Sequence, residues 1–442
     1  MSDGWYRRAL AEMQHDETWG GGRAEPAERV LVEFVSANPT GPITVASGRH
    51  AAFGDSLARL LEFAGNGVKR EYYVNDAGTQ VLRFGESIRA RARGEEPPED
   101  GGYHGDYVTE LAQRIPGAAD MDAEELAEQG VELMLESIRE TLARFRVEMD
   151  GYFSERSLHD GGAVDEALER LRETGLVFET EGAVWLRTSE LGDDKDRVLR
   201  RSDGEWTYFA PDIAYHETKM KREFEHAINV LGADHHGYQA RIIGAWKALG
   251  GDPDAFEVII MQLVNLIEGG QQKQMSKRKG DFVTLDDLVD DIGVDAARFF
   301  LVMRSHDTTL DLDLALAREQ SQDNPVYYVQ YAHARIASIL RRAEAEPDPA
   351  APANEELHPS AKSLIKALLD YPAEIDSAVE LRAPHRLTTY ARELSQQFSA
   401  FYRDCKVVGT PEEPFRLALS VQTQRVIAQS LELLGVSAPE EM

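Results

Sequence analysis

The 442-residue sequence has one cysteine, few lysines and no long apolar run. The single cysteine, Cys405, excludes an intramolecular disulfide framework and a metal site built from a cysteine cluster. No stretch approaches the roughly 20 apolar residues that a membrane-spanning helix needs. The first residues also lack the pattern of a secretion signal. These absences predict a protein of the reducing cytoplasm that has no membrane partner.

Positive charge is scarce as well. The sequence has 48 Lys and Arg against 78 Asp and Glu, which gives a formal net charge of −30, and only 11 of its residues are lysine. A chain this acidic cannot cover nucleic acid with a general basic surface, so any such contact must be concentrated in a few places. With 42% apolar residues, the chain can form two or three folded cores.

The hydrophobic pattern predicts two α/β segments separated by a long insertion. In the first segment, a buried strand at 30–35 leads through turn residues into a helix at 47–64, which Gly65 ends, and a second strand follows at 68–76. In the second segment, strands at 227–232 and 256–261 flank a helix that ends near 249. A strand, helix and strand in this order indicate a parallel sheet.

The other regions are expected to be mainly helical. Residues 80–175 have a helical and charged pattern, residues 176–209 are rich in strands and turns, and residues from 285 onward are predicted to be helical to the end. A Pro/Ala hinge at 347–352 interrupts the last region.

Two short segments are candidates for binding phosphate. The turn at 33–47 joins a strand to a helix N-terminus, where free N–H groups favour anions, although an ordinary βα turn is the simpler interpretation. Residues 273–280 hold three of the 11 lysines, which suggests either a phosphate contact or a solvated basic loop.

Two further segments carry polar side chains with alternative interpretations. Tyr208 and Asp212 share one face if their segment is helical, but a core tyrosine and a capping aspartate would give the same pattern. Asp234 follows a strand, where a carboxylate can bind ribose. The adjacent histidines after it point apart, so no metal site is expected there.

Considered together, five segments carry a resemblance to a known family. They are VEFVSANPTGP at 32–42, EYYVNDAG at 71–78, GADHHGY at 232–238, MSKR at 275–278 and NPVYYVQYAHAR at 324–335. From about residue 29 onward the sequence closely resembles the arginyl-tRNA synthetases, which are class I enzymes. The resemblance implies an α/β fold, with a class I Rossmann catalytic domain that contains an insertion and an all-α anticodon-binding-like domain after it.

The implied domains have the following boundaries. An N-terminal helix and linker are expected at 1–27, the catalytic domain at 28–284 with its insertion at about 80–205, a helical linker that contacts the tRNA stem at 285–345, and the anticodon-binding-like domain at 346–442. The family's usual N-terminal domain, which contacts the tRNA elbow, is expected to be absent. The family is usually monomeric, so a monomer is expected.

The resemblance also implies roles for individual residues. A guanidinium pocket would be formed by Glu33, Asn38, Tyr208 and Asp212, with Gln239 as an added polar contact. The nucleotide or the 3′ end of tRNA would be bound by Gly232, Asp234, His235, Lys273, Met275, Ser276, Lys277 and Arg278. No metal ligands are expected.

The sequence departs from the family at its HxGH signature, whose two histidines contact ATP phosphates. The four positions here are Thr44, Val45, Ala46 and Ser47. Removing one preorganised donor to developing charge costs on the order of 3 kcal/mol, so losing both histidines suggests that amino-acid activation is lost. The first lysine of the family's KMSKR loop is Gln274 here, and Pro211 stands where the family often has arginine.

These departures favour an aminoacyl-tRNA-dependent aminoacyltransferase. The pattern resembles the synthetase-like enzymes of peptidyl-nucleoside antibiotic biosynthesis, as in the blasticidin S pathway. That resemblance implies transfer of leucine from leucyl-tRNA to the amine of a guanidine-bearing small molecule, demethylblasticidin S. Thr44, Ser47 and His50 would then be the catalytic residues, the partners would be aminoacylated tRNA and the guanidino molecule, and no cofactor would be required.

Two alternatives remain open. One is a true arginine–tRNA ligase that uses ATP and Mg²⁺ and tolerates the changed signature. The other is a non-catalytic tRNA-binding paralogue.

Overall fold

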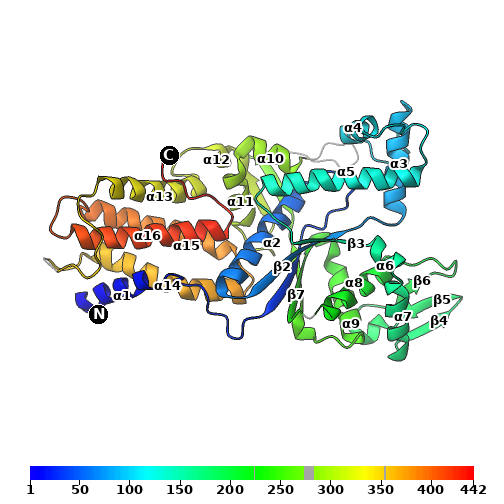
Figure 1. The fold of residues 1–442 in the computed structure, drawn as a ribbon, viewed down its shortest axis with the longest axis horizontal. Coiled ribbons are helices and arrows are strands. Elements are labelled where there is room, and N and C mark those ends of the chain that lie inside the picture. Colours follow the sequence, from blue (N-terminus) through cyan, green and yellow to red (C-terminus); the bar gives the residue numbers. More distant parts are fainter. Residues whose placement is uncertain (223, 273–282, 353–354) are drawn as a thin grey trace.

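A computed structural model of the chain describes residues 1–222, 224–272, 283–352 and 355–442. Within these residues, no helix is long and apolar enough to cross a membrane. Figure 1 shows three regions: a central parallel sheet, a group of helices at one end that contains both α1 and the C-terminal helices, and two excursions at the other end.

The central sheet has five parallel strands in the order β3-β2-β1-β7-β8. They are β1 (Arg29–Glu33), β2 (Gly67–Val74), β3 (Gly151–Ser154), β7 (His226–Gly232) and β8 (Phe256–Met261). The strand order reverses between β1 and β7, and in open α/β sheets ligands bind outside the carboxyl ends of the strands at such a point. The expected class of fold is confirmed, and the sheet predicts where the site lies.

Alternation along β1 divides the core into two layers. Val30 and Val32 belong to the core that includes α2 (Val45–Ala64), whereas Leu31 belongs to the core that includes α8 (Phe209–Lys221) and α9 (Gln239–Ala248). A strand buried on both faces explains why β1 is an unbroken apolar run in the sequence.

Helix α2 begins and ends at recognisable caps. Thr44 accepts a hydrogen bond from the backbone N–H of Ser47 at the N-terminus, and Gly65 ends the helix with φ 112°, a conformation that favours glycine. Gly54 lets the helix approach β1, because a Cβ there would lie 2.2 Å from the ring of Phe34. Helix α2 therefore packs closely on β1, and its N-terminus lies at the end of the turn that follows this strand.

The predicted insertion at about 80–205 is not continuous. Helices α3 (Thr79–Ala92), α4 (Asp106–Arg114) and α5 (Ala123–Arg144) form a unit with its own apolar core, but the chain then returns to the main sheet as β3, which pairs with β2. The sequence analysis missed this four-residue strand, because every one of its residues is only half-buried. The second excursion contains α6 (Arg156–Asp160), α7 (Ala163–Glu173) and the antiparallel strands β4 (Val177–Thr180), β5 (Ala183–Leu186) and β6 (Arg197–Arg200).

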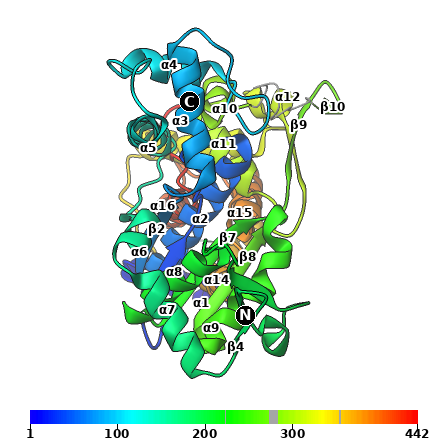
Figure 2. The ribbon, with the colours of Figure 1, turned by 90° about the vertical axis from the view of Figure 1, so that its right-hand side faces the viewer.

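The expectation that residues from 285 onward are all helical is wrong at one place. Strand β11 (Leu310–Asp313) pairs in parallel with β9 (Val264–Glu268), which also pairs with β10 (Gln271–Gln272). Helices α11 (Val294–Val302) and α12 (Leu314–Arg318) pack against this small sheet, and α10 (Leu285–Ile292) packs against both of these helices. Figure 2 shows the small sheet extending away from the central sheet.

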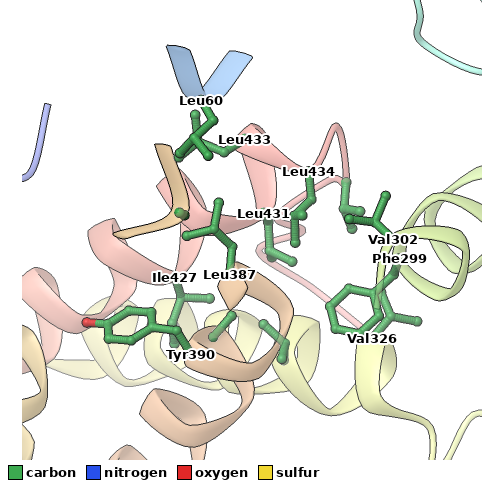
Figure 3. Close-up of a cluster of buried hydrophobic side chains, with 14 of the residues drawn as sticks. Leu60, Phe299, Val302, Val326, Leu387, Tyr390, Ile427, Leu431, Leu433 and Leu434 are labelled. Atoms are coloured by element: carbon green, nitrogen blue, oxygen red, sulfur yellow. The ribbon is translucent and has the colours of Figure 1, made fainter. Parts of the chain in front are cut away.

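Four long helices complete the chain: α13 (Pro325–Arg342), α14 (Pro359–Glu380), α15 (His385–Asp404) and α16 (Glu413–Leu433). Their core continues into the catalytic region, as Figure 3 shows for Leu60 of α2 beside Leu433, and for Phe299 of α11 beside Val326. The N-terminal helix α1 (Asp3–His15) packs on the same bundle, where Arg7 pairs with Glu412 at 2.6 Å. The helical domain and the sheet therefore share one core.

Candidate active site

The turn after β1 forms one wall of the candidate site. Val35 and Ser36 have φ values of 68° and 39°, so two successive non-glycine residues lie in the left-handed region. Such strain persists where the surroundings over-determine it, and it is common at functional sites. This turn redirects the chain from the carboxyl end of β1 toward the N-terminus of α2.

Two buried carboxylates at this edge of the sheet have raised pKa values. Burial raises the pKa of Asp212 to about 7, and the nearby Glu33 carboxylate adds to the shift, although a hydrogen bond from the Tyr238 hydroxyl opposes it. Burial likewise raises the pKa of Glu155 to about 7, with the negative charge of Asp212 as the next cause. Glu33 raises the pKa of Asp212, and Asp212 in turn raises that of Glu155, so these acids form a site with surplus negative charge, which a cation would stabilise.

An unsatisfied hydroxyl lies beside these acids. The Tyr73 hydroxyl is buried and makes no hydrogen bond of good geometry within the described part of the chain, although it is close enough to Glu155 to lower the pKa of that carboxyl. The charge of Asp212 also helps to raise the pKa of Tyr73. A buried polar group without a partner is costly, so this hydroxyl is a candidate ligand contact.

Glu33, a predicted guanidinium ligand, has a different partner in the structure. Its carboxylate pairs with the ammonium of Lys219, which is fully buried and also donates to Asn229 Oδ1 at 2.6 Å. Ser36 donates a hydrogen bond of 3.3 Å to the same carboxylate. Glu33 therefore supports the turn and adds negative potential beside Asp212.

The other predicted pocket residues lie around the same strand ends. The Asn38 side chain is exposed and donates to Gln80 Oε1 at 3.0 Å, and Gln239 donates to the Val258 carbonyl at 3.2 Å. Tyr208 is 56% exposed and occupies the N-cap position of α8 without a side-chain capping hydrogen bond, so it is not a core tyrosine. Asp212 follows in the first turn of that helix, as its predicted spacing from Tyr208 required.

The predicted nucleotide residues gather at the ends of α2 and β7. A Cβ placed on Gly232 would lie 3.5 Å from Cε1 of His50 and 2.6 Å from Oδ1 of Asp234. His235 lies 3.7 Å from the Asp234 carboxylate. Burial lowers the pKa of His50 to about 4, so its imidazole is neutral and can donate a hydrogen bond without carrying charge.

The hydroxyls of Thr44 and Ser47 form the N-terminal cap of α2. Their oxygens are 3.4 Å apart, and the Thr44 oxygen accepts from the Ser47 backbone N–H at 3.3 Å. Lys273, Met275, Ser276, Lys277 and Arg278 lie outside the described residues. The chain immediately after them does return to this site, because Thr44 forms a β-bridge with Thr284, and Leu285 donates its N–H to the Ile43 carbonyl at 2.8 Å.

Sequence reasoning missed four residues of the site: Glu155, Tyr73, Lys219 and Tyr238. Glu155 directly follows β3, the strand that was also missed, and Tyr238 was present in the GADHHGY segment without a role being assigned to it. Lys219 had a usable signal, since an isolated lysine within an apolar helix face suggests a buried partner.

Comparisons with known proteins agree with this architecture. The model for the catalytic domain of class I tRNA synthetases (R) matches residues 10–89 and 119–322, and the DALR anticodon binding domain matches residues 329–442. An arginine–tRNA ligase of Frankia alni is 48% identical over 96% of this chain and 80% of its own length. The chain belongs to the arginyl-tRNA synthetase family. An arginine–tRNA ligase of Heliobacterium modesticaldum is 44% identical over 98% of this chain and 81% of its own length.

Solved structures show the same relationship. A chain from Campylobacter jejuni, assigned as an arginyl-tRNA synthetase, is 35% identical, and each chain covers all of the other with a TM-score of 0.92. The arginyl-tRNA synthetase of Thermus thermophilus has a TM-score of 0.81 at 24% identity and covers 99% of this chain and 86% of its own. At that identity it supports the fold alone.

These findings overturn the aminoacyltransferase interpretation. Relatives 44–48% identical over nearly the whole chain are arginine–tRNA ligases, and none of the findings points to leucyl-tRNA, demethylblasticidin S or antibiotic biosynthesis. The expectation that no cofactor is required is wrong for the same reason. The error arose because two side chains at the signature were given more weight than the retained helix N-terminus and strand ends.

Proposed function

We propose that this chain is an ATP-dependent arginine–tRNA ligase. The observation that carries the proposal is the 48% identity to an arginine–tRNA ligase over 96% of the chain. The surplus negative charge at Asp212 and Glu155 supports it independently, because a guanidinium is the cation that best matches paired carboxylates.

Arginine binding would use the negative charge of the two acids. A guanidinium between Asp212 and Glu155 would lower the pKa of both acids and form charge-assisted hydrogen bonds with them. The Tyr73 hydroxyl would gain a partner at the same time. Asn38 and Gln239, at the same edge, would contact the polar end of the amino acid.

ATP would bind where α2 meets the end of β7. The N–H groups and dipole at the α2 N-terminus favour phosphates, and Asp234 at the end of β7 is placed to accept from ribose hydroxyls. The described residues contain no group of three or more metal ligands. Mg²⁺ usually retains several waters and is bound through substrate phosphates together with one or two carboxylates.

His50 is the residue that could offset the altered signature. It lies beside Gly232 and Asp234, close to the α2 N-terminus, and its neutral imidazole can donate one hydrogen bond to the nucleotide. The Thr44 and Ser47 hydroxyls add short neutral donors. We therefore expect ATP binding to depend on His50.

tRNA binding would be local, as the charge of −30 requires. On α13 the rings of Tyr327 and Tyr331 stack at 6.2 Å, and Arg335 lies over Tyr331 at 4.6 Å. Arg335 also lies 5.7 Å from the ring of Tyr402 on α15. Stacked aromatic rings beside arginine are suited to unpaired bases.

The proposal is tested by charging tRNA with labelled arginine in the presence of ATP and Mg²⁺. Arginine-dependent charging that fails without ATP supports it. Binding of tRNA without any charging would instead identify a non-catalytic relative. Asp212→Asn should raise the KM for arginine, whereas Asp376→Asn, a surface change on α14 that removes only a pair with Arg23, should leave it unchanged.

A further inference from the structure

The turn that carries Asn38 is strained and is held in place by other elements. Val35 is β-branched and has φ 68°, which is a true outlier for such a residue. Residues in such conformations persist only where their surroundings over-determine them. The hydrogen bonds that reach the turn from outside therefore decide its geometry.

Two of these bonds come from the neighbouring strand β2. The Tyr73 backbone N–H donates to Ser36 Oγ at 3.1 Å, and the Tyr72 hydroxyl donates to the Ala37 carbonyl at 2.6 Å. Both donors lie within the sheet core, so they fix the first half of the turn.

The second half of the turn is held by the helical insertion. The Tyr107 hydroxyl of α4 donates to the Thr40 carbonyl at 2.9 Å, and Gln80 of α3 accepts from the Asn38 side chain at 3.0 Å. Thr40 is 5% exposed. A Cβ on Gly41 would lie 3.3 Å from the Tyr107 oxygen, so the phenol is in direct contact with the turn.

We propose that Tyr107 is a positioning residue for the arginine site. Its hydroxyl fixes the Thr40 carbonyl and thereby the placement of Asn38, two residues earlier, and of the chain that enters α2. The insertion is then part of the substrate site, although Tyr107 itself touches no substrate. The inference rests on the proposed function only for the identity of the ligand.

The test compares Tyr107→Phe with a matched control. Tyr390→Phe also removes a tyrosine hydroxyl that donates to a backbone carbonyl, that of Ala367 at 2.8 Å, but within the helical domain. We expect Tyr107→Phe to weaken arginine binding about three- to tenfold, the usual effect of losing one neutral hydrogen bond. Titration calorimetry with L-arginine measures this affinity, and charging assays should show a raised KM with kcat changed less than twofold. Tyr390→Phe should leave both unchanged.

A second variant keeps the inference testable if Tyr107→Phe fails to fold. Gln80→Ala is an exposed change that removes the other insertion contact, and it should weaken arginine binding in the same direction. Equal arginine affinity in wild type, Tyr107→Phe and Gln80→Ala would overturn the inference, as would a loss confined to kcat.

The calorimetric result is separable from the proposed function. Failure of the wild type to charge tRNA, with arginine binding intact, would refute the ligase proposal and leave the role of Tyr107 to be decided by the same titration.

Discussion

Lowering the pH through 7 should weaken the binding of arginine. Asp212 and Glu155 each have a pKa of about 7 in the unliganded protein, mainly because burial disfavours their ionised forms. At pH 8 each acid is about 90% ionised and at pH 6 about 10%. A guanidinium binds the ionised form, so protons compete with arginine across this range.

The expected magnitude follows from the number of carboxylates that must ionise. The affinity should fall about tenfold between pH 8 and pH 6 if one particular acid must be ionised, and roughly a hundredfold if both must be, with 1.4 kcal/mol for each factor of ten. Binding lowers both pKa values, so arginine should release protons near pH 7.

The same shift predicts how stability varies with pH. The folded pKa of each acid lies above its unfolded value of about 4, so the unliganded protein binds more protons than the unfolded chain between pH 4 and 7. The contribution of these two acids to stability should therefore fall as the pH rises through that window. Bound arginine should restore the loss, so the rise in Tm caused by arginine should be larger at pH 8 than at pH 6.

Isothermal titration of L-arginine at pH 6, 7 and 8, in two buffers of different ionisation enthalpy, measures both the affinity and the released protons. Asp212→Asn should flatten the pH profile as well as weaken binding. An affinity that stays within twofold from pH 6 to 8, or that rises as the pH falls, would refute this reasoning.

Three further predictions concern the nucleotide site and the core. His50→Ala should raise the KM for ATP about tenfold, the effect of losing roughly one good hydrogen bond, with the KM for arginine unchanged; equal effects on both would contradict its placement beside the nucleotide. Arg298→Met should lower the free energy of unfolding by about 2 to 4 kcal/mol in urea, because the buried carbonyls of Leu434 and Phe145 lose their donor and Asp55 loses one of its three cationic partners. Gly54→Ala should cost about 1 to 3 kcal/mol in the same assay, because its methyl group would overlap the Phe34 ring; wild-type stability in that variant would mean that α2 can shift away from β1.

The sequence predicted most of the elements that form the site. The buried apolar runs at β1, β7 and β8 and the Gly65 cap were visible because burial and chain reversal leave local patterns. Strands β3 and β11 were missed. Each has only four residues. All residues of β3 are half-buried, and β11 is buried on one face only.

The candidate site could be predicted only in part. Asp212 was identified through the family resemblance, since its spacing to Tyr208 alone left a capping aspartate open, and its electrostatic partner Glu155 lies 57 residues earlier and comes near it only through the fold. The buried pairing of Glu33 with Lys219 was likewise beyond any local pattern. The altered signature at Thr44 and Ser47 led to a wrong prediction of function. The substitutions reveal which side chains are lost, but they do not reveal the backbone N–H groups that remain at the helix N-terminus.

Charging of tRNA with arginine tests the central claim most directly. The purified chain should attach labelled L-arginine to tRNA in a reaction that requires ATP and Mg²⁺, and Asp212→Asn should raise the KM for arginine in it. No acid-precipitable arginine above the no-enzyme control, with the protein folded and tRNA in excess, would contradict the account.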